Sequence, residues 1–228
     1  GFPWGGYPPG LVSDDVLALR MWRAMCPALQ ERWPEAFHPE YWGGVTIRNG
    51  RVVQLWLIES DLTGAVPAEI GQFTSLKRLV ICGTQLTSLP AEIGQLTALT
   101  VLDLSDNKLT SLPAEIGQLT SLQRLNLRRN QLTSMPAEIG QLTALTELIL
   151  RDNKLTSLPA EVGQLTSLRE LYLYNNKLTS LPVEIGQLTS LKELYLRGNR
   201  LTSVPAAVRE LRAAGCRVRT DDGVRVDA

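Results

Sequence analysis

The residues that most often carry catalysis or metal binding are few in this chain of 228 residues and stand far apart. There is one histidine, His38, and the three cysteines are Cys26, Cys82 and Cys216. Their spacing matches neither a metal-ligand set nor a disulfide framework. Phosphate-binding glycine loops and the His-Glu-x-x-His motif are also absent. The sequence therefore predicts a protein that is not an enzyme and that holds no cofactor and no metal.

Charged side chains are abundant but balanced, with 23 basic and 23 acidic residues. This balance gives no field that would draw the chain to nucleic acid, and no apolar run approaches the length of a membrane span. Glu92, Glu115 and Glu138 lie 23 residues apart, so we interpret them as parts of a solvated face and not as acid–base pairs. The odd cysteine count and the lack of glycosylation sequons favour an intracellular, reducing environment.

The glutamates belong to a longer sequence segment that is repeated every 23 residues. Apolar residues alternate within each copy, as Leu102 and Leu104 do, which predicts a strand with one buried face. Copies begin at Leu76, Leu99, Leu122, Leu145, Leu168 and Leu191, and a looser first copy begins at Val52. One unit cannot bury its leucines alone, so we expect neighbours to stack around a shared core with their strands in a parallel sheet.

The other half of each unit reads Leu-Pro-Ala-Glu-Ile-Gly and predicts a single helical turn on the opposite side of the core. Pro90 suits the first helical position of such a turn. Gly94 is expected to end the turn with a positive φ angle.

The pattern Leu-x-x-Leu-x-Leu-x-x-Asn-x-Leu at this period resembles leucine-rich repeat proteins over roughly residues 52–204. The resemblance implies an α/β fold, a curved horseshoe-like solenoid with a concave parallel sheet and short convex helical turns. It also implies a ladder of asparagine side chains inside the solenoid, which Ser60 and Thr84 replace in the first two units. The ladder residues are Asn107, Asn130, Asn153, Asn176 and Asn199.

The N-terminal end of the repeats needs a cap, because an open leucine core would aggregate. Residues 1–51 supply the expected arm and cap, with Ser13 as the N-cap of a helix. Its expected buried face holds Leu17, Met21, Ala24 and Ala28. The stretch that follows, from Tyr41 to Leu55, is similar to the N-terminal cap of plant leucine-rich repeat proteins without its cysteines. We expect Tyr41 and Trp42 to pack over the first repeat.

The C-terminal cap is expected over residues 205–228. A helix over 206–214 should end at Gly215, with Val208 and Leu211 on its inner face. Alternation in 217–219 and 224–226 around Asp222-Gly223 predicts a short hairpin.

The outward strand positions vary from copy to copy, whereas the sequence of the convex turns, Leu-Pro-Ala-Glu-Ile-Gly, hardly changes. Drift alone would also alter the exposed convex glutamates and glutamines, so this contrast favours a concave face adapted to a partner. Tyrosine and arginine, which are enriched at binding hot spots, gather on adjacent strands. The candidate binding residues are Tyr172, Tyr174, Tyr195, Arg128, Arg151, Arg197, Glu147, Glu170, Glu193 and Asn126, with Trp56 as a second patch.

The three glutamates of that set should stack one strand apart, which is unfavourable between like charges. Pairing of Arg124 with Glu147 would relieve part of the repulsion.

We therefore expect a protein-interaction module that binds a protein or peptide through its concave face. Two alternatives stay open. The chain could be the sensing or regulatory segment of a larger receptor kinase or Roco-type GTPase, or a structural repeat without a dedicated ligand. A carbohydrate or small-molecule ligand has no specific motif behind it.

Overall fold

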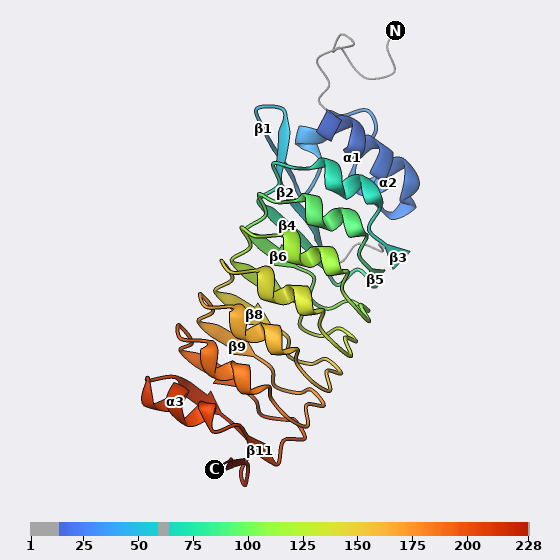
Figure 1. Ribbon diagram of the computed structural model, residues 1–228. Coiled ribbons are helices and arrows are strands. Elements are labelled where there is room, and N and C mark those ends of the chain that lie inside the picture. The colour runs from blue at the N-terminus through green and yellow to red at the C-terminus, as the bar shows by residue number, and fades with distance from the viewer. Residues whose placement is uncertain (1–13, 59–63, 228) are drawn as a thin grey trace.

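The computed structural model describes residues 14–58 and 64–227. The expected helix start at Ser13, the arm before it and the ladder position Ser60 lie outside these residues. Within them the chain forms a solenoid in which successive units stack along one axis (Figure 1).

A nine-stranded sheet lines one side of the solenoid, in the order β1-β2-β4-β6-β7-β8-β9-β10-β12. Seven of its strands come from the repeats, and all seven run parallel. They are β2 (Arg51–Ile58), β4 (Arg78–Cys82), β6 (Val101–Asp103), β7 (Arg124–Asn126), β8 (Glu147–Ile149), β9 (Glu170–Tyr172) and β10 (Glu193–Tyr195). This confirms the expected parallel sheet, whose strands lie about 4.8 Å apart.

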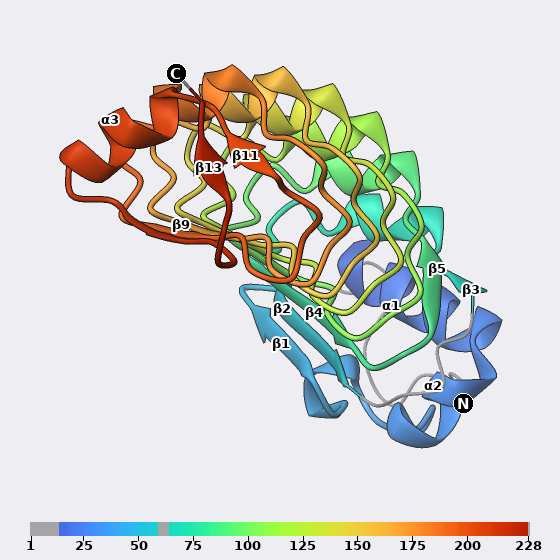
Figure 2. The same cartoon turned by 90° about the horizontal axis from the view of Figure 1, so that it is seen from below.

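Short 3₁₀ turns face away from the sheet, on the opposite side of the core (Figure 2). They are η2 (Ala68–Gln72), η3 (Ala91–Gln95), η4 (Ala114–Gln118), η5 (Ala137–Gln141), η6 (Ala160–Gln164) and η7 (Val183–Gln187). Two details differ from expectation. Pro90 precedes the first helical residue of η3 instead of occupying that position. Gly94 does not have a positive φ, and it is needed because a Cβ there would lie 2.8 Å from the carbonyl oxygen of Glu115.

Leucines at the inward positions fill a continuous core, and the asparagines link one unit to the next beside it. Asn153 donates from Nδ2 to the carbonyl of Leu127 at 2.9 Å and to that of Leu150 at 3.0 Å, while its Oδ1 accepts from the Leu132 amide at 3.0 Å. The side chain thereby pairs backbone groups that the turn would leave unsatisfied. In the second unit the buried Thr84 donates its hydroxyl to Asn107 Oδ1 at 2.9 Å.

The N-terminal cap consists of α1 (Asp14–Met25), α2 (Pro27–Arg32), η1 (Pro39–Tyr41) and β1 (Val45–Arg48), which pairs antiparallel with β2. The expected buried face of the first helix is wrong, since Leu17 is 50% exposed and Met21 is 48% exposed. The buried face instead holds Asp15, Ala18, Leu19 and Trp22. The helix has apolar residues on both sides, and tryptophan packing selects one of them: the rings of Trp22 and Trp33 meet edge to face at 6.0 Å.

The two aromatic residues of the cap that were expected to pack over the first repeat, Tyr41 and Trp42, differ in burial. Trp42 is buried and stacks on Trp33 with ring centroids 5.1 Å apart, as expected of a packing residue. Tyr41 does not pack over the first repeat, since 73% of it is exposed.

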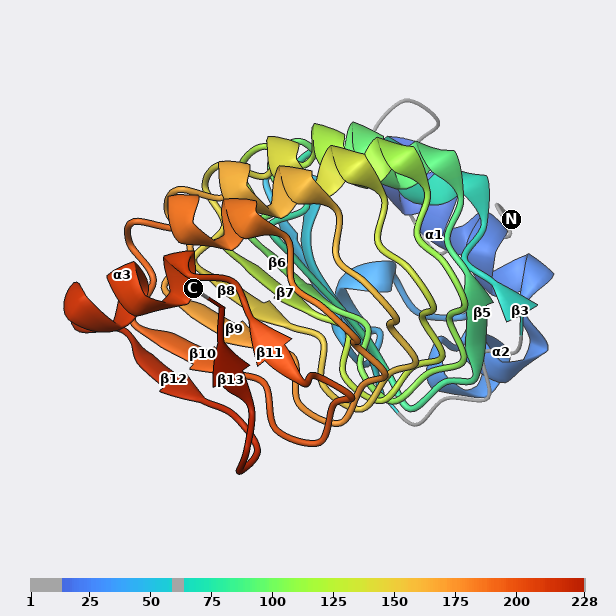
Figure 3. The same ribbon diagram turned by 60° about the horizontal axis from the view of Figure 1, so that its bottom comes forward.

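The C-terminal cap contains α3 (Ala207–Ala213), whose inner residues Val208 and Leu211 are buried as expected. The expected hairpin is wrong. β12 (Arg217–Arg219) pairs parallel with β10, and β13 (Arg225–Val226) pairs parallel with β11 (Ser203–Val204). The segment therefore continues the solenoid as a shortened eighth unit, with β12 beside β10 (Figure 3). A second two-stranded sheet joins β3 (Gly64–Ala65) to β5 (Leu86–Ser88) at the other end.

Candidate binding face on the sheet

The outward side chains of the sheet fall into three rows that cross the strands, because the register keeps equivalent residues of each unit side by side. The start row contains Gln54, Arg78, Val101, Arg124, Glu147, Glu170 and Glu193. The middle row contains Trp56, Val80, Asp103, Asn126, Ile149, Tyr172 and Tyr195. The end row contains Ile58, Cys82, Ser105, Arg128, Arg151, Tyr174 and Arg197.

Three tyrosines and one arginine form a contiguous group, which we call the tyrosine cluster. The rings of Tyr172 and Tyr195 stack with centroids 4.9 Å apart and planes 5° apart. Tyr174 meets Tyr195 edge to face at 6.5 Å, and the guanidinium carbon of Arg151 lies 5.3 Å from the Tyr174 ring centroid. These tyrosine side chains are partly exposed and each ring is fixed by a neighbour, so the cluster presents a rigid aromatic surface.

The tyrosine hydroxyls are bonded to the start row. Tyr172 donates to Glu170 Oε2 at 2.6 Å, and Tyr195 donates to Glu193 Oε2. Bonding to the Glu170 carboxylate, followed by burial, raises the pKa of Tyr172, and the bond to Glu193 is the main cause of a raised pKa at Tyr195. Both rings are therefore neutral at physiological pH, and their donors are already used.

The start row stacks Glu147, Glu170 and Glu193 in register. The expected partner of the first is confirmed, with Arg124 Nη1 3.2 Å from Glu147 Oε2. Arg217 of β12 supplies a partner that the sequence did not suggest, 3.1 Å from Glu193 Oε1. Burial and the neighbouring carboxylates of Glu170 and Asp103 raise the pKa of Glu147, against the opposing effect of Arg124.

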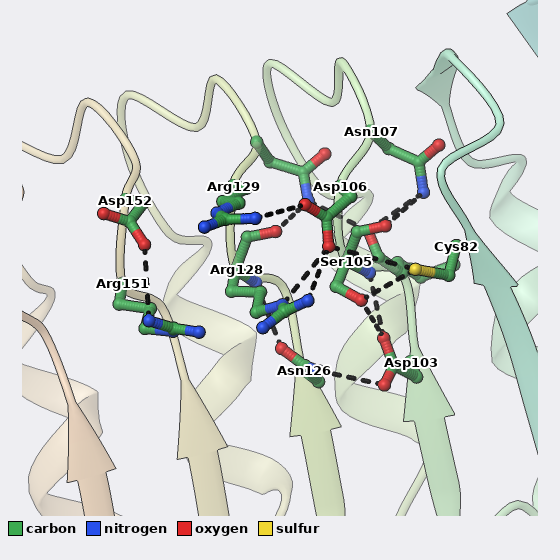
Figure 4. Close-up of polar contacts among 12 residues, drawn as sticks. Cys82, Asp103, Ser105, Asp106, Asn107, Asn126, Arg128, Arg129, Arg151 and Asp152 are labelled. Atoms are coloured by element: carbon green, nitrogen blue, oxygen red, sulfur yellow. Dashed lines mark hydrogen bonds and ion pairs between the residues drawn. The ribbon is translucent and has the colours of Figure 1, made fainter.

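A polar network joins the next strands of the face (Figure 4). Asp103 accepts from Ser105 Oγ at 2.6 Å and from Asn126 Nδ2 at 2.9 Å. Arg128 donates to Asp106 Oδ2 from Nε at 3.2 Å and from Nη2 at 2.9 Å. These groups are paired with one another, and Asn126 is only 6% exposed. The polar groups of this network, which lies beside the tyrosine cluster, therefore satisfy one another and are less available to a ligand.

No cluster that could hold a metal occurs among residues 14–58 and 64–227. Cys82 belongs to the polar network, where its Sγ lies 3.3 Å from Ser105 Oγ. His38 caps η1, with its Nδ1 accepting from the Glu40 amide at 3.4 Å. Among the helices described, none is long and apolar enough to cross a membrane.

A family model described as a leucine-rich repeat region matches residues 47–173, which is more than half of the chain, and a model of two leucine-rich repeats matches residues 166–210. The chain belongs to the leucine-rich repeat family. No curated protein sequence matches it significantly.

Solved leucine-rich repeat structures share the fold. A leucine-rich repeat protein of Leptospira interrogans is 43% identical with a TM-score of 0.67, over 73% of this chain and 42% of that one. The PEPR1–AtPEP1 structure gives 27% identity and a TM-score of 0.79, over 93% of this chain and 31% of that one. The plant peptide hormone receptor RGFR1 in complex with RGF2 gives 36% identity and a TM-score of 0.67, over 82% of this chain and 29% of that one. This chain spans less than half the length of each.

The sequence-predicted residues of this leucine-rich repeat protein fall into separate places. Tyr172, Tyr174, Tyr195 and Arg151 meet in the tyrosine cluster, beside the three glutamates. Arg128 and Asn126 belong to the polar network instead.

The two remaining candidates lie at opposite ends of the sheet. Arg197 is exposed and donates from Nε to the carbonyl of Thr220 at 3.2 Å. Trp56 is 41% exposed on β2, and four strands separate it from β9. It therefore does not share a site with the tyrosines.

Packing contributes to the contrast between the nearly constant sequence of the convex turns and the variable residues of the concave face. Five of the six convex glycines lie under the glutamate and glutamine of the next unit, whereas Gly186 lies under Ala207 of α3. A Cβ on Gly117 would lie 2.6 Å from the carbonyl oxygen of Glu138 and 2.7 Å from Gln141 Oε1. The convex glycines are thus constrained by packing, so the constancy of these positions does not argue for a ligand on the other face. The tyrosine cluster itself must carry that inference.

Proposed function

We propose that this chain is a non-enzymatic recognition module that binds a peptide or protein segment at the tyrosine cluster on the concave face. The observation that carries the proposal is the contact among Tyr172, Tyr174 and Tyr195, with Arg151 over one ring. A folded chain gains little by exposing three large rings together, whereas such groups dominate the energy of many interfaces.

The surrounding fold supports this proposal physically. The cluster is held on parallel strands that pair with neighbours on both sides, and its rings and hydroxyls are fixed by contacts within the protein. Little side-chain freedom would then be lost on binding, which favours affinity. Structural relatives are consistent with it, since RGFR1 is a peptide hormone receptor solved with RGF2.

Selection from a random peptide display library on the immobilised protein tests the proposal. Selected peptides are then measured against a Tyr172→Ala, Tyr174→Ala, Arg151→Ala variant whose folding is verified by circular dichroism. We expect affinity to fall at least about tenfold, because hot-spot truncations cost about 2 kcal/mol or more. Tyr41→Ala, which removes a tyrosine from the cap, is the control and should leave binding unchanged.

Equal binding by wild type and the triple variant would refute the tyrosine cluster as the site and direct the search to Trp56. A library that yields no binder would favour a structural repeat without a dedicated ligand.

A further inference from the structure

The charges on the two sides of the tyrosine cluster have opposite sign. Glu147, Glu170 and Glu193 form one flank on β8, β9 and β10, and Arg151 and Arg197 belong to the other. Equivalent residues of the two flanks are four positions apart along each strand, so the flanks are separated by about 13 Å at 3.3 Å per residue. The aromatic rings of the middle row lie between them.

The acidic flank lacks one positive charge. Glu147 has Arg124 at 3.2 Å and Glu193 has Arg217 at 3.1 Å. Glu170, between them, accepts the Tyr172 hydroxyl but forms no ion pair among the described residues. Like charges on neighbouring strands repel, so a cation placed over Glu170 would relieve an unfavourable arrangement.

The basic flank is open to an anion. The nearest carboxylate oxygen to Arg151 belongs to Asp152, at 3.8 Å, which is a weak ion pair. Arg197 uses its Nε on the Thr220 carbonyl at 3.2 Å, and its side chain is exposed. Guanidinium groups bind carboxylates through two parallel hydrogen bonds, so both arginines can receive an acidic side chain.

We propose that the ligand is an extended peptide that crosses β8, β9 and β10 over the tyrosine cluster and carries basic and acidic side chains in alternation. This inference rests on the proposed function and specifies its ligand. Successive side chains of an extended peptide point to opposite sides. Basic residues therefore face Glu170 and its neighbours, while acidic residues face Arg151 and Arg197.

The dimensions of the face agree with this ligand. A peptide midway between the flanks lies about 6.5 Å from each, within reach of a lysine or glutamate side chain. The two strand steps from β8 to β10 measure about 10 Å, and same-side charges in the peptide recur about every 6.6 Å. Four to five alternating residues thus fill the face.

A sugar fits the cluster less well than this peptide. Tyr172 and Tyr195 each use a ring face on the other, and both hydroxyls are bonded to glutamates. Few ring faces and few donors are left for a carbohydrate.

Two labelled octapeptides of identical composition test the proposal by fluorescence anisotropy at low salt. One is Lys-Glu repeated four times, and the other is Lys-Lys-Glu-Glu repeated twice, which places half of its charges toward a like-charged flank. We expect the alternating peptide to bind the full chain at least about tenfold more tightly. Glu170→Gln should weaken that binding several-fold, because it removes the unpaired charge but keeps an acceptor for Tyr172. Glu138→Gln makes the same charge change on the convex side and should have no effect.

Equal affinity for the two peptides, no binding of the alternating peptide at millimolar concentration, or indifference to Glu170→Gln would each overturn the inference. Library peptides that depend on Tyr172 and Tyr174 but lack alternating charge would also overturn it and leave the proposed function intact. Library peptides that ignore those tyrosines would refute the proposed function itself.

Discussion

Glycine in the convex turns has a packing role that its backbone angles do not reveal. Except for Gly186, which meets Ala207, these glycines lie where the glutamate and glutamine of the next unit cross the turn, and the nearest atoms differ from turn to turn. At Gly117 the nearest atom is a backbone carbonyl oxygen, whereas at Gly71 it is the end of the Gln95 side chain. A side chain can rotate away from an added methyl group, but a carbonyl held in the solenoid cannot.

Gly117→Ala should therefore destabilise the protein by about 2–3 kcal/mol through overpacking. Gly71→Ala should cost less, about 1 kcal/mol, because the end of Gln95 can move and only the Cβ of Glu92, at 3.0 Å, remains close to the added methyl group. Urea denaturation of the two variants measures the difference. Equal costs would mean that the convex stacking is looser than these contacts indicate.

Glu147, on the concave face, makes the stability of the fold depend on pH. Its pKa is raised above the ordinary value of 4.5, mainly by burial, so the folded state binds this proton more tightly than the unfolded state does. The contribution of Glu147 to stability is therefore lowest at neutral pH and rises as pH falls through the raised pKa. Below 4.5 the group is protonated in both states and the contribution levels off.

Glu147→Gln should accordingly stabilise the fold at pH 7, by less than about 1 kcal/mol because solvent screens a half-buried group. The advantage should vanish by about pH 4, where the wild-type carboxyl is also neutral. Urea midpoints at the two pH values provide the measurement. An advantage that persists unchanged at pH 4 would show that lost charge is not its cause.

At the residue scale the repeat made much of the candidate face predictable. A fixed period sets the register, so the neighbours Tyr172 and Tyr195, and the pair Arg124 and Glu147, could be placed without a structure. Arg217 could not, because it follows the last regular unit and its partner depends on how the cap folds.

At the scale of elements, the caps are where the sequence was least informative. Helix α1 has Leu17 and Met21 on one side and Leu19 and Trp22 on the other, so periodicity alone does not decide which side is buried. In the structure a buried charged residue on the same side as Trp22 adds to the tryptophan packing that selects this side. Asp15 is fully buried, accepts from the Val52 amide at 2.7 Å and lies 2.9 Å from Arg51 Nε. Hydrophobic pattern reasoning puts a carboxylate outside, so it could not find this anchor.

The prediction of a C-terminal hairpin was wrong for a related reason. Alternating residues on either side of Asp222-Gly223 satisfy the local pattern of a hairpin, and Gly223 does have a positive φ of 84°. The two strands instead pair with β10 and β11, because the open end of the solenoid offers them parallel edges. A local pattern cannot report a partner that lies a full unit away.

Asp15→Asn tests whether this carboxylate anchors the N-terminal cap. The change removes the charge opposite Arg51 and should destabilise the protein by about 1–3 kcal/mol, less than a fully buried pair because Arg51 is partly exposed. Asp14→Asn, an exposed neighbour in the same helical turn, should change stability by less than about 0.5 kcal/mol. Hydrogen exchange should show faster exchange in α1 for the first variant only. Unchanged protection of α1 would mean that tryptophan packing holds the cap without Asp15.

At the scale of the whole molecule, the main contacts between elements of the described residues join neighbouring units. Each repeat strand pairs only with the strands beside it, and α3 packs on η7 and β12 at the end. In such a solenoid, stability is approximately a sum of unit and interface contributions. A defect at one end should therefore weaken with distance along the axis.

Val208→Ala combined with Leu211→Ala removes the buried contacts of α3 and should cost about 3–6 kcal/mol locally. Hydrogen exchange should then rise sharply in α3, β12 and β10 and progressively less toward β4, because opening the last units leaves the earlier interfaces intact. Glu210→Ala with Arg212→Ala changes the exposed side of the same helix and should leave the profile close to wild type. A uniform rise from β12 to β4 would show that the solenoid opens as one cooperative body. In that case the tyrosine cluster on β9 and β10 would share the stability of the whole chain, whereas a graded response would make this candidate binding face responsive to the C-terminal cap.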